Sequence, residues 1–144
     1  MRVKSIVVGL VLASAAVAPA IAADAIEARQ TILKAIGDAT RPVAAMLKGE
    51  TPFEMMRVKA ALLAQAQGAD ALAVLYPDNS RTGKTEASPR IWAEKERFLA
   101  LYAKLAADAR AAEAAIVDEA SFKAIFPKQL ATCKACHDDY RVKK

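Results

Sequence analysis

One seam of residues near the C-terminus limits the folds open to this chain, because two residue types that bind cofactors lie on it. Phe122, Phe126 and Leu130 are followed on the same helical stripe by Cys133 and His137, at intervals of four, four, three and four residues. An amphipathic helix turns such a stripe toward a core. The fold must therefore leave room beside this last helix for whatever the cysteine and the histidine bind.

The five residues Cys133-Lys134-Ala135-Cys136-His137 have the Cys-x-x-Cys-His pattern of c-type haem attachment. Two thiols nearly one turn apart reach the two vinyl groups on one side of a porphyrin, and the imidazole that follows binds the iron. We therefore predict one covalently attached haem c per chain, with thioether bonds at Cys133 and Cys136 and with His137 as the axial ligand of the haem iron.

A thiol redox pair, half of a zinc site and a disulfide are the alternatives for these cysteines. The chain lacks the βαβ pattern around thioredoxin-like motifs, and it has no second pair of ligands for zinc. A separation of two residues inside a helix suits a disulfide badly, and His137 is the only histidine in the sequence. The haem interpretation is therefore favoured.

The N-terminus has the pattern of a secretory signal peptide. Arg2 and Lys4 precede an apolar run from Ile6 to Ala18, and small residues follow up to position 23. A membrane anchor is the alternative, but the run is shorter than the ~20 apolar residues of a spanning helix. We predict that residues 1–22 are a cleaved signal and that residues 23–144 form one haem domain in the periplasm, since c-type haem is attached outside the cytoplasm.

The net charge of the chain restricts the kinds of partner that it can bind. Loss of residues 1–22 removes two basic residues and no acid, so the formal net charge falls from +5 to +3. This mildly basic balance favours acidic partners, and neither a nucleic acid nor a membrane is expected to bind.

Helical periodicity, without any strand pattern of period two, covers the rest of the chain. We predict four helices. The first covers residues 25–47, with a kink at Pro42 and a stop at Gly49, and the second runs from Thr51-Pro52 to about residue 76. The third runs from Ser88-Pro89 to residue 116, and the fourth is capped by Asp118 and interrupted at Pro127. Residues 77–88 are a polar loop, either functional or a simple crossover. The pattern predicts an all-α, antiparallel up-down-up-down four-helix bundle with covalently bound haem.

Any sixth iron ligand must come from upstream, because the seven residues after His137 include no methionine or histidine. Met46, Met55 and Met56 are the candidates, although methionine in a helix more often fills a core. Without them, an apolar residue of the first helix covers the iron, which stays five-coordinate and open to small ligands.

The whole region 23–144 resembles the cytochromes c′, the four-helix class of c-type cytochromes found in bacterial periplasms. The resemblance is carried by four stretches: Arg29-Gln30-Thr31-Ile32-Leu33, Lys48-Gly49-Glu50, Pro89-Arg90-Ile91-Trp92 and Cys133 to Arg141. It implies that Leu33 is the distal residue over the iron, that Arg141 lies beside the proximal imidazole, and that Arg29, Gln30, Thr85 and Glu86 contact the haem, with Arg29 near a propionate.

The resemblance also implies the function. With leucine at position 33, the chain resembles the five-coordinate, high-spin members of the family, which bind NO and CO and largely exclude O₂. Members with methionine at this position are six-coordinate electron carriers. A homodimer through the first two helices and periplasmic redox partners are implied as well. An enzyme is not expected, because haem catalysis usually recruits a distal histidine or arginine, and the sole histidine lies on the proximal side.

Overall fold

The protein is a bundle of four long helices, as predicted. The computed structural model describes residues 17–142, with side chains from residue 23 onward, so most of the predicted signal peptide, residues 1–16, lies outside the described residues. The helices are α1 (Val17–Leu47), α2 (Met55–Leu72), α3 (Arg90–Ala93), α4 (Lys95–Ala115) and α5 (Glu119–Tyr140), with a 3₁₀ turn η1 (Asp78–Ser80). No named β-strand occurs among the described residues.

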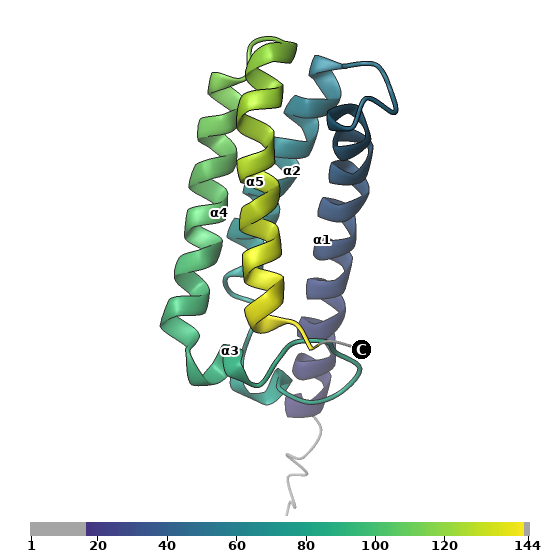
Figure 1. Ribbon diagram of the computed structural model, residues 1–144. Coiled ribbons are helices and arrows are strands. Elements are labelled where there is room, and N and C mark those ends of the chain that lie inside the picture. Colours follow the sequence, from purple (N-terminus) through teal and green to yellow (C-terminus); the bar gives the residue numbers. More distant parts are fainter. Residues whose placement is uncertain (1–16, 143–144) are drawn as a thin grey trace, which may run out of the picture.

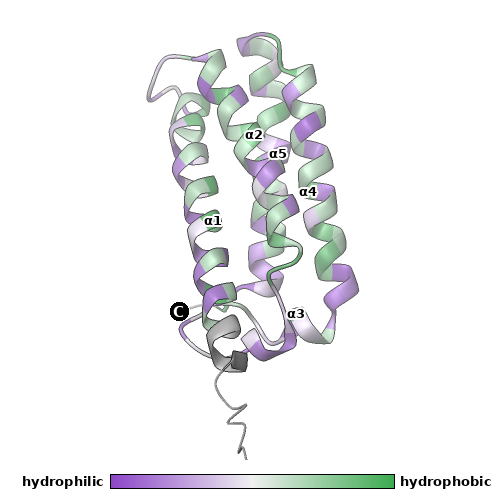
Figure 2. Ribbon diagram, turned by 180° about the vertical axis from the view of Figure 1, so that it is seen from behind, coloured by the Kyte–Doolittle hydropathy of each residue, from purple (hydrophilic) through white to green (hydrophobic). Residues whose placement is uncertain are grey.

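Successive long helices run in opposite directions and form a ring in the order α1, α2, α4, α5 (Figure 1). The closely packed pairs are α1–α2, α2–α4 and α4–α5; among the described helices, α1 and α5 do not form such a pair. Hydrophilic and hydrophobic residues interchange along every helix (Figure 2), as amphipathic helices require.

Two apolar clusters fill the bundle. The first, at the end with the α1–α2 turn, contains Val43, Met46, Val58, Leu62, Phe122 and Phe126. The second, at the other end, is largely aromatic and contains Leu72, Tyr76, Ile91, Trp92, Phe98, Tyr102 and Tyr140. Each fully buried large apolar side chain stabilises the fold by about 1.5–3 kcal/mol.

The end of α1 confirms the predicted stop at Gly49. This glycine has φ of +75°, a left-handed conformation that costs glycine little. Its N–H donates to the carbonyl of Met46, and the N–H of Glu50 donates to the carbonyl of Ala45. These two bonds form a Schellman motif, which satisfies carbonyls that the helix leaves free.

The predicted start of the second helix at Thr51-Pro52 is wrong. The helix begins at Met55, and Glu54 is its N-cap. Residues 51–54 instead cross from α1 to α2, and this path lets Phe53 pack on Phe122 with ring centroids 5.4 Å apart. The non-helical path of residues 51–54 thus accompanies an aromatic contact between distant parts of the chain.

The predicted third helix is two helices. The first of them has Pro89 at its N-cap, and the Oγ of Ser88 accepts the N–H of Arg90 at 3.3 Å. The helix breaks at Glu94, where φ is −121° and ψ is 39°. The Glu94 carboxylate holds this corner, because it accepts hydrogen bonds from Arg90 Nε at 2.7 Å and from the hydroxyl of Tyr140 at 2.8 Å.

The prolines do not divide their helices. α1 and α5 both run continuously through Pro42 and Pro127. Both side chains are exposed, so water can take the carbonyl that each proline leaves without a donor. Asp118 caps α5 as predicted, in a capping box with Ser121.

Candidate functional site

The two cysteines and the histidine lie in the last two turns of α5. Cys133 and Cys136 are half-buried free thiols, and His137 is exposed. The helix that presents them is fixed at its other end by the cap at Asp118 and by the buried rings of Phe122 and Phe126. The first half of α5, which is held by these contacts, therefore fixes the orientation of the motif.

Both thiols are in an environment that keeps them protonated. Burial raises the pKa of Cys136 to about 11, with the nearby Cys133 and Asp139 adding to the effect. Burial likewise raises the pKa of Cys133. Reactive redox cysteines and zinc ligands need the thiolate form, and in the described part of the chain no three His, Cys, Asp or Glu side chains gather into a metal site. These thiols do not have the environment of a redox pair or a zinc site.

The surroundings of His137 favour its neutral form. Partial desolvation of the ring, together with the positive charge of Arg141, lowers its pKa. The neutral imidazole is the form that ligates iron.

One residue on the stripe of α1 that carries Arg29 and Thr40 is exposed to solvent. Arg29 and Thr40 lie on the inward stripe of α1, since Arg29 is only 2% exposed and Thr40 is hydrogen-bonded to the fully buried Gln65. Leu33 lies between them on the same stripe and is 38% exposed. A leucine on an inward stripe reaches solvent only where the neighbouring helix stands away.

The side chains on the facing seam of α5 also become more exposed along the helix. Phe122 and Phe126 are fully buried, Cys133 is half-buried and His137 is exposed. Leu33 on α1 and His137 on α5 are thus the exposed members of the two seams, while Arg29, one turn nearer the aromatic cluster than Leu33, is buried. A flat cofactor held between facing helices needs a space beside such residues, so the residues present fit a haem attached to α5.

The aromatic cluster closes the inner side of this space. Cys136 from α5 and Ile32 and Ile36 from α1 pack against the same group of buried rings. Within it, the hydroxyls of Tyr76 and Tyr102 are 2.7 Å apart and buried, and burial raises the pKa of both phenols. The rings therefore present an uncharged, apolar surface.

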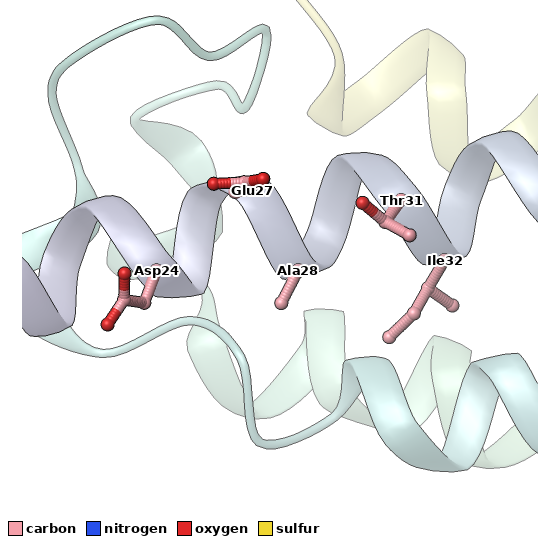
Figure 3. Close-up of a pocket in the computed structure, with 5 residues that line it drawn as sticks. All are labelled: Asp24, Glu27, Ala28, Thr31 and Ile32. Carbon is pink, nitrogen blue, oxygen red and sulfur yellow. The ribbon is translucent and has the colours of Figure 1, made fainter.

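Two shallow hollows elsewhere have a different character. One of about 450 Å³ runs along the flank of α1 and is lined by Asp24, Glu27, Ala28, Thr31 and Ile32 (Figure 3). The other, of about 390 Å³, lies between α4 and α5 and is lined mostly by polar and small side chains. Neither is lined by the cysteines or His137, so neither belongs to the site on α5.

Arg29 is an anchor inside the bundle. Its guanidinium donates to the carbonyl of Leu75 at 3.0 Å and to the hydroxyl of Ser80 at 2.8 Å. It also lies over the ring of Tyr76, 4.6 Å from the centroid. These contacts tie α1 to the end of α2 and to η1.

The other residues implied by the resemblance meet beside the end of α5. Gln30 Nε2 donates to the carbonyl of Lys84 at 2.7 Å, and Arg141 Nε donates to Glu86 at 2.7 Å. Thr85 lies between these two contacts, and its hydroxyl accepts the N–H of Ala87 at 3.1 Å. The loop thus joins α1 to α5.

All three methionines lie away from this end. Met46 is 5% exposed inside the first apolar cluster, and Met55 packs against the same cluster. Met56 is 80% exposed at the start of α2. Among the described residues, no methionine lines the space beside His137.

A row of hydrogen-bonded polar side chains that was not predicted crosses the bundle. Gln129 Nε2 donates to Gln65 Oε1 at 2.9 Å, and Gln65 Nε2 donates to the hydroxyl of Thr40 at 3.0 Å. These bonds join α5, α2 and α1 between the two apolar clusters. Gln65 lies on the stripe that Val58, Leu62, Ala69 and Leu72 define, and a polar residue on that stripe is the signal that could have revealed this row.

Comparison with known proteins agrees with this site. The family model described as Cytochrome C' matches residues 24–141. Cytochrome c′ of Rhodopseudomonas palustris is 50% identical over 122 residues, which cover 84% of each chain. Its solved structure superimposes with a TM-score of 0.81, covering 84% of this chain and 98% of that one. Cytochrome c-556 of Agrobacterium fabrum is 35% identical over 145 residues, covering 100% of this chain and 99% of the relative.

These relatives are haemoproteins with covalently attached c-type haem, and they share the arrangement of helices found here. The family model spans most of the chain and includes the Cys-x-x-Cys-His motif. The chain is therefore a c-type cytochrome that carries a covalently attached haem, and it belongs to the cytochrome c′ family.

Proposed function

We propose that this protein is a periplasmic cytochrome with a five-coordinate, high-spin haem that carries one electron and binds NO or CO. Cys133 and Cys136 hold the haem through thioether bonds, and His137 is its single protein ligand. The haem supplies a redox-active iron with one open position. The protein supplies the attachment, the proximal imidazole and the surroundings of the open side.

The position of Leu33 carries this proposal. It shares the stripe of α1 that carries the buried Arg29 and the partly buried Thr40, and it is 38% exposed. Its side chain is a hydrocarbon, which cannot bind iron but hinders any ligand that must displace it. The alternative is a six-coordinate electron carrier with methionine and histidine ligands. The placement of Met46 and Met55 in the first apolar cluster speaks against it.

The polar groups nearest to Leu33 on α1 favour NO and CO over O₂. Bound O₂ is stabilised by a hydrogen-bond donor on the distal side. Arg29, one turn before Leu33, uses its guanidinium on Leu75 and Ser80. Gln30 directs its amide to Lys84. The same engagement of Arg29 leaves it unsuited to act as a distal acid or base, so we propose a carrier or gas-binding protein and not an enzyme.

Optical spectra of the holoprotein test the proposal. Ferric and ferrous high-spin spectra, with a ferrous spectrum that changes on adding CO or NO, are expected for an open distal side. Low-spin spectra that do not change on adding CO would instead establish the six-coordinate carrier with a methionine ligand.

Export and a periplasmic location rest on the predicted cleavage of residues 1–22. α1 begins at Val17 and so extends into this predicted segment. None of the helices within residues 17–142 combines the length and the apolarity that crossing a bilayer requires. Mass spectrometry of the protein from a periplasmic extract tests the cleavage site.

A homodimer through α1 and α2 is also part of the proposal. The outer face of α2 carries an exposed apolar stripe that includes Met56 and Leu63, at 80% and 53% exposed, and Val74 continues it just beyond the helix, at 80%. Exposed apolar stripes of this kind are common at interfaces between proteins. Redox partners with acidic surfaces would use the remaining, mildly basic surface.

Replacing Leu63 with glutamate is expected to convert the dimer to a monomer, because it places a charge in an apolar interface. Dimer mass in analytical ultracentrifugation should fall by half, while the haem spectrum stays unchanged. Val117→Glu is the matched control, since Val117 is 70% exposed in the turn between α4 and α5. A Leu63→Glu protein that remains dimeric would exclude this face.

A further inference from the structure

The loop between η1 and α3 connects the two helices that border the haem space. We call residues 80–88 the strap. Figure 1 shows this segment at the lower end of the bundle, passing from the base of α1 to the C-terminal end of α5. Since α1 and α5 are not a closely packed pair among the described helices, the strap is a principal connection between them at this end.

On the α1 side the strap is held at three places. Ser80 is fully buried and takes two hydrogen bonds from Arg29, at 2.8 Å to its hydroxyl and 3.2 Å to its carbonyl. Gly83 lies so close to α1 that an added Cβ would be 3.2 Å from Cδ1 of Ile26. Gln30 then donates to the carbonyl of Lys84 at 2.7 Å.

On the α5 side the strap pairs with the end of the chain as a short antiparallel bridge between Ala87 and Arg141. The N–H of Val142 donates to the carbonyl of Glu86 at 2.8 Å, and the N–H of Ser88 donates to that of Tyr140 at 2.9 Å. Two nitrogens of the Arg141 guanidinium lie 2.7 and 2.5 Å from Oε2 of Glu86. The backbone bonds make this attachment firmer than an exposed ion pair alone.

The two attachments are close together in the strap and symmetric about the haem space. Lys84 and Glu86 are separated by one residue, so a stretch of about 7 Å of extended chain connects the helices. Gln30 lies one turn before Leu33 on α1, and Arg141 follows His137 by four residues, just beyond the end of α5 at Tyr140. Each helix is therefore fixed one turn from the residue that faces the iron.

We propose that the strap sets the distance between α1 and α5 across the haem, and thereby how tightly Leu33 covers the open side of the iron. Gln30, Gly83 and Glu86 are positioning residues in this device. Farther from the strap, the hydrogen bonds from Thr40 through Gln65 to Gln129 connect the same two helices by way of α2. When the strap is loosened, the lower part of α1 moves away from α5, and Leu33 hinders small ligands less.

Gly83→Ala is the main test, because it disturbs the strap without removing a side chain that could touch the haem. Gly83 has φ of +123°, a conformation that alanine rarely adopts. We expect faster hydrogen exchange of the Ser88 and Val142 amides and a rise of roughly two- to tenfold in the CO association rate of the ferrous protein. Gln30→Ala should also raise the CO association rate. In the double variant Gln30→Ala with Glu86→Gln, the rate should rise by less than the product of the two single-variant factors, since both substitutions loosen the same connection.

Gly49→Ala is the matched control. Gly49 also has a positive φ, of +75°, but lies in the α1–α2 turn, where an added Cβ meets nothing within 4 Å. It should lower stability and leave the CO rate unchanged. The proposal is overturned if Gly83→Ala and Gln30→Ala leave either the exchange or the CO rate at the wild-type value, or if Gly49→Ala speeds CO binding equally.

The CO-rate experiment rests on the proposed five-coordinate function. A second measurement, which does not depend on CO binding, tests the strap separately from that function. Spin labels at Ala35→Cys and Ala131→Cys, both exposed, report the distance between α1 and α5. Gly83→Ala should lengthen or broaden this distance, and an unchanged distribution contradicts the strap. A wild-type protein indifferent to CO contradicts the proposed function, while the spin-label distances still decide on the strap.

Discussion

Replacing Leu33 with alanine is expected to speed CO binding to the ferrous protein by roughly fivefold to 150-fold. Moving a bulky side chain against its packed neighbours costs about 1–3 kcal/mol, and each ~1.4 kcal/mol removed from a barrier is a factor of ten in rate. Leu33 borders the open space with 38% of its surface exposed, so its truncation widens that space directly. Flash photolysis of the CO complex measures the rate.

Leu47→Ala is the control for this substitution. Leu47 lies on the same helix, but it packs against the first apolar cluster at the opposite end of the bundle. It should lower the free energy of unfolding and leave the CO rate unchanged. An unchanged rate in Leu33→Ala would mean that another residue covers the iron, and Ile36, which also lies on the inward side of α1, would be examined next.

Removing both motif cysteines is expected to abolish covalent haem attachment. Cys136→Ser should leave a single thioether and weaken haem retention, and Cys133→Ser with Cys136→Ser should leave none. Acidified acetone removes haem that is bound only by non-covalent contacts and leaves thioether-bound haem on the protein, so the double variant should lose essentially all of its haem. Haem remaining on the protein after extraction with acid and acetone is the measurement.

The thiol environment supports this expectation. Cys136 is a half-buried side chain that packs against the aromatic cluster, and serine is close to it in size, so the serine variant alters little else at the site. Ala135→Ser is the control, because Ala135 lies between the two cysteines on the exposed side of the helix. A Cys136→Ser holoprotein with two intact thioethers would refute the role given to this residue.

The sequence predicted those parts of the fold that depend on local chemistry. The helical seams, the stop at Gly49 and the cap at Asp118 are confirmed, because each rests on residues within a few positions of one another. The start of α2 was predicted too early, since the packing of Phe53 on Phe122 is a contact between distant segments. The break at Glu94 was missed for the same reason, because Tyr140 holds it from 46 residues away.

The candidate site divides in the same way. The spacing of Cys133, Cys136 and His137 carries its own chemistry and identified the cofactor. The partner of Arg29 is Ser80, which no periodic pattern singles out. The hydrogen-bonded pair Gln65 and Gln129 likewise comes from positions 64 apart in the chain.

The sequence by itself determined that this chain forms amphipathic helices and attaches a haem to the last of them, because periodicity and covalent chemistry act over one or two turns. Only the tertiary structure decided that α1 stands away from α5, that the methionines lie at the far end, and that residues 80–88 join α1 to the end of α5. These features depend on which distant side chains share one space, and packing selects them among many arrangements that the same helices allow.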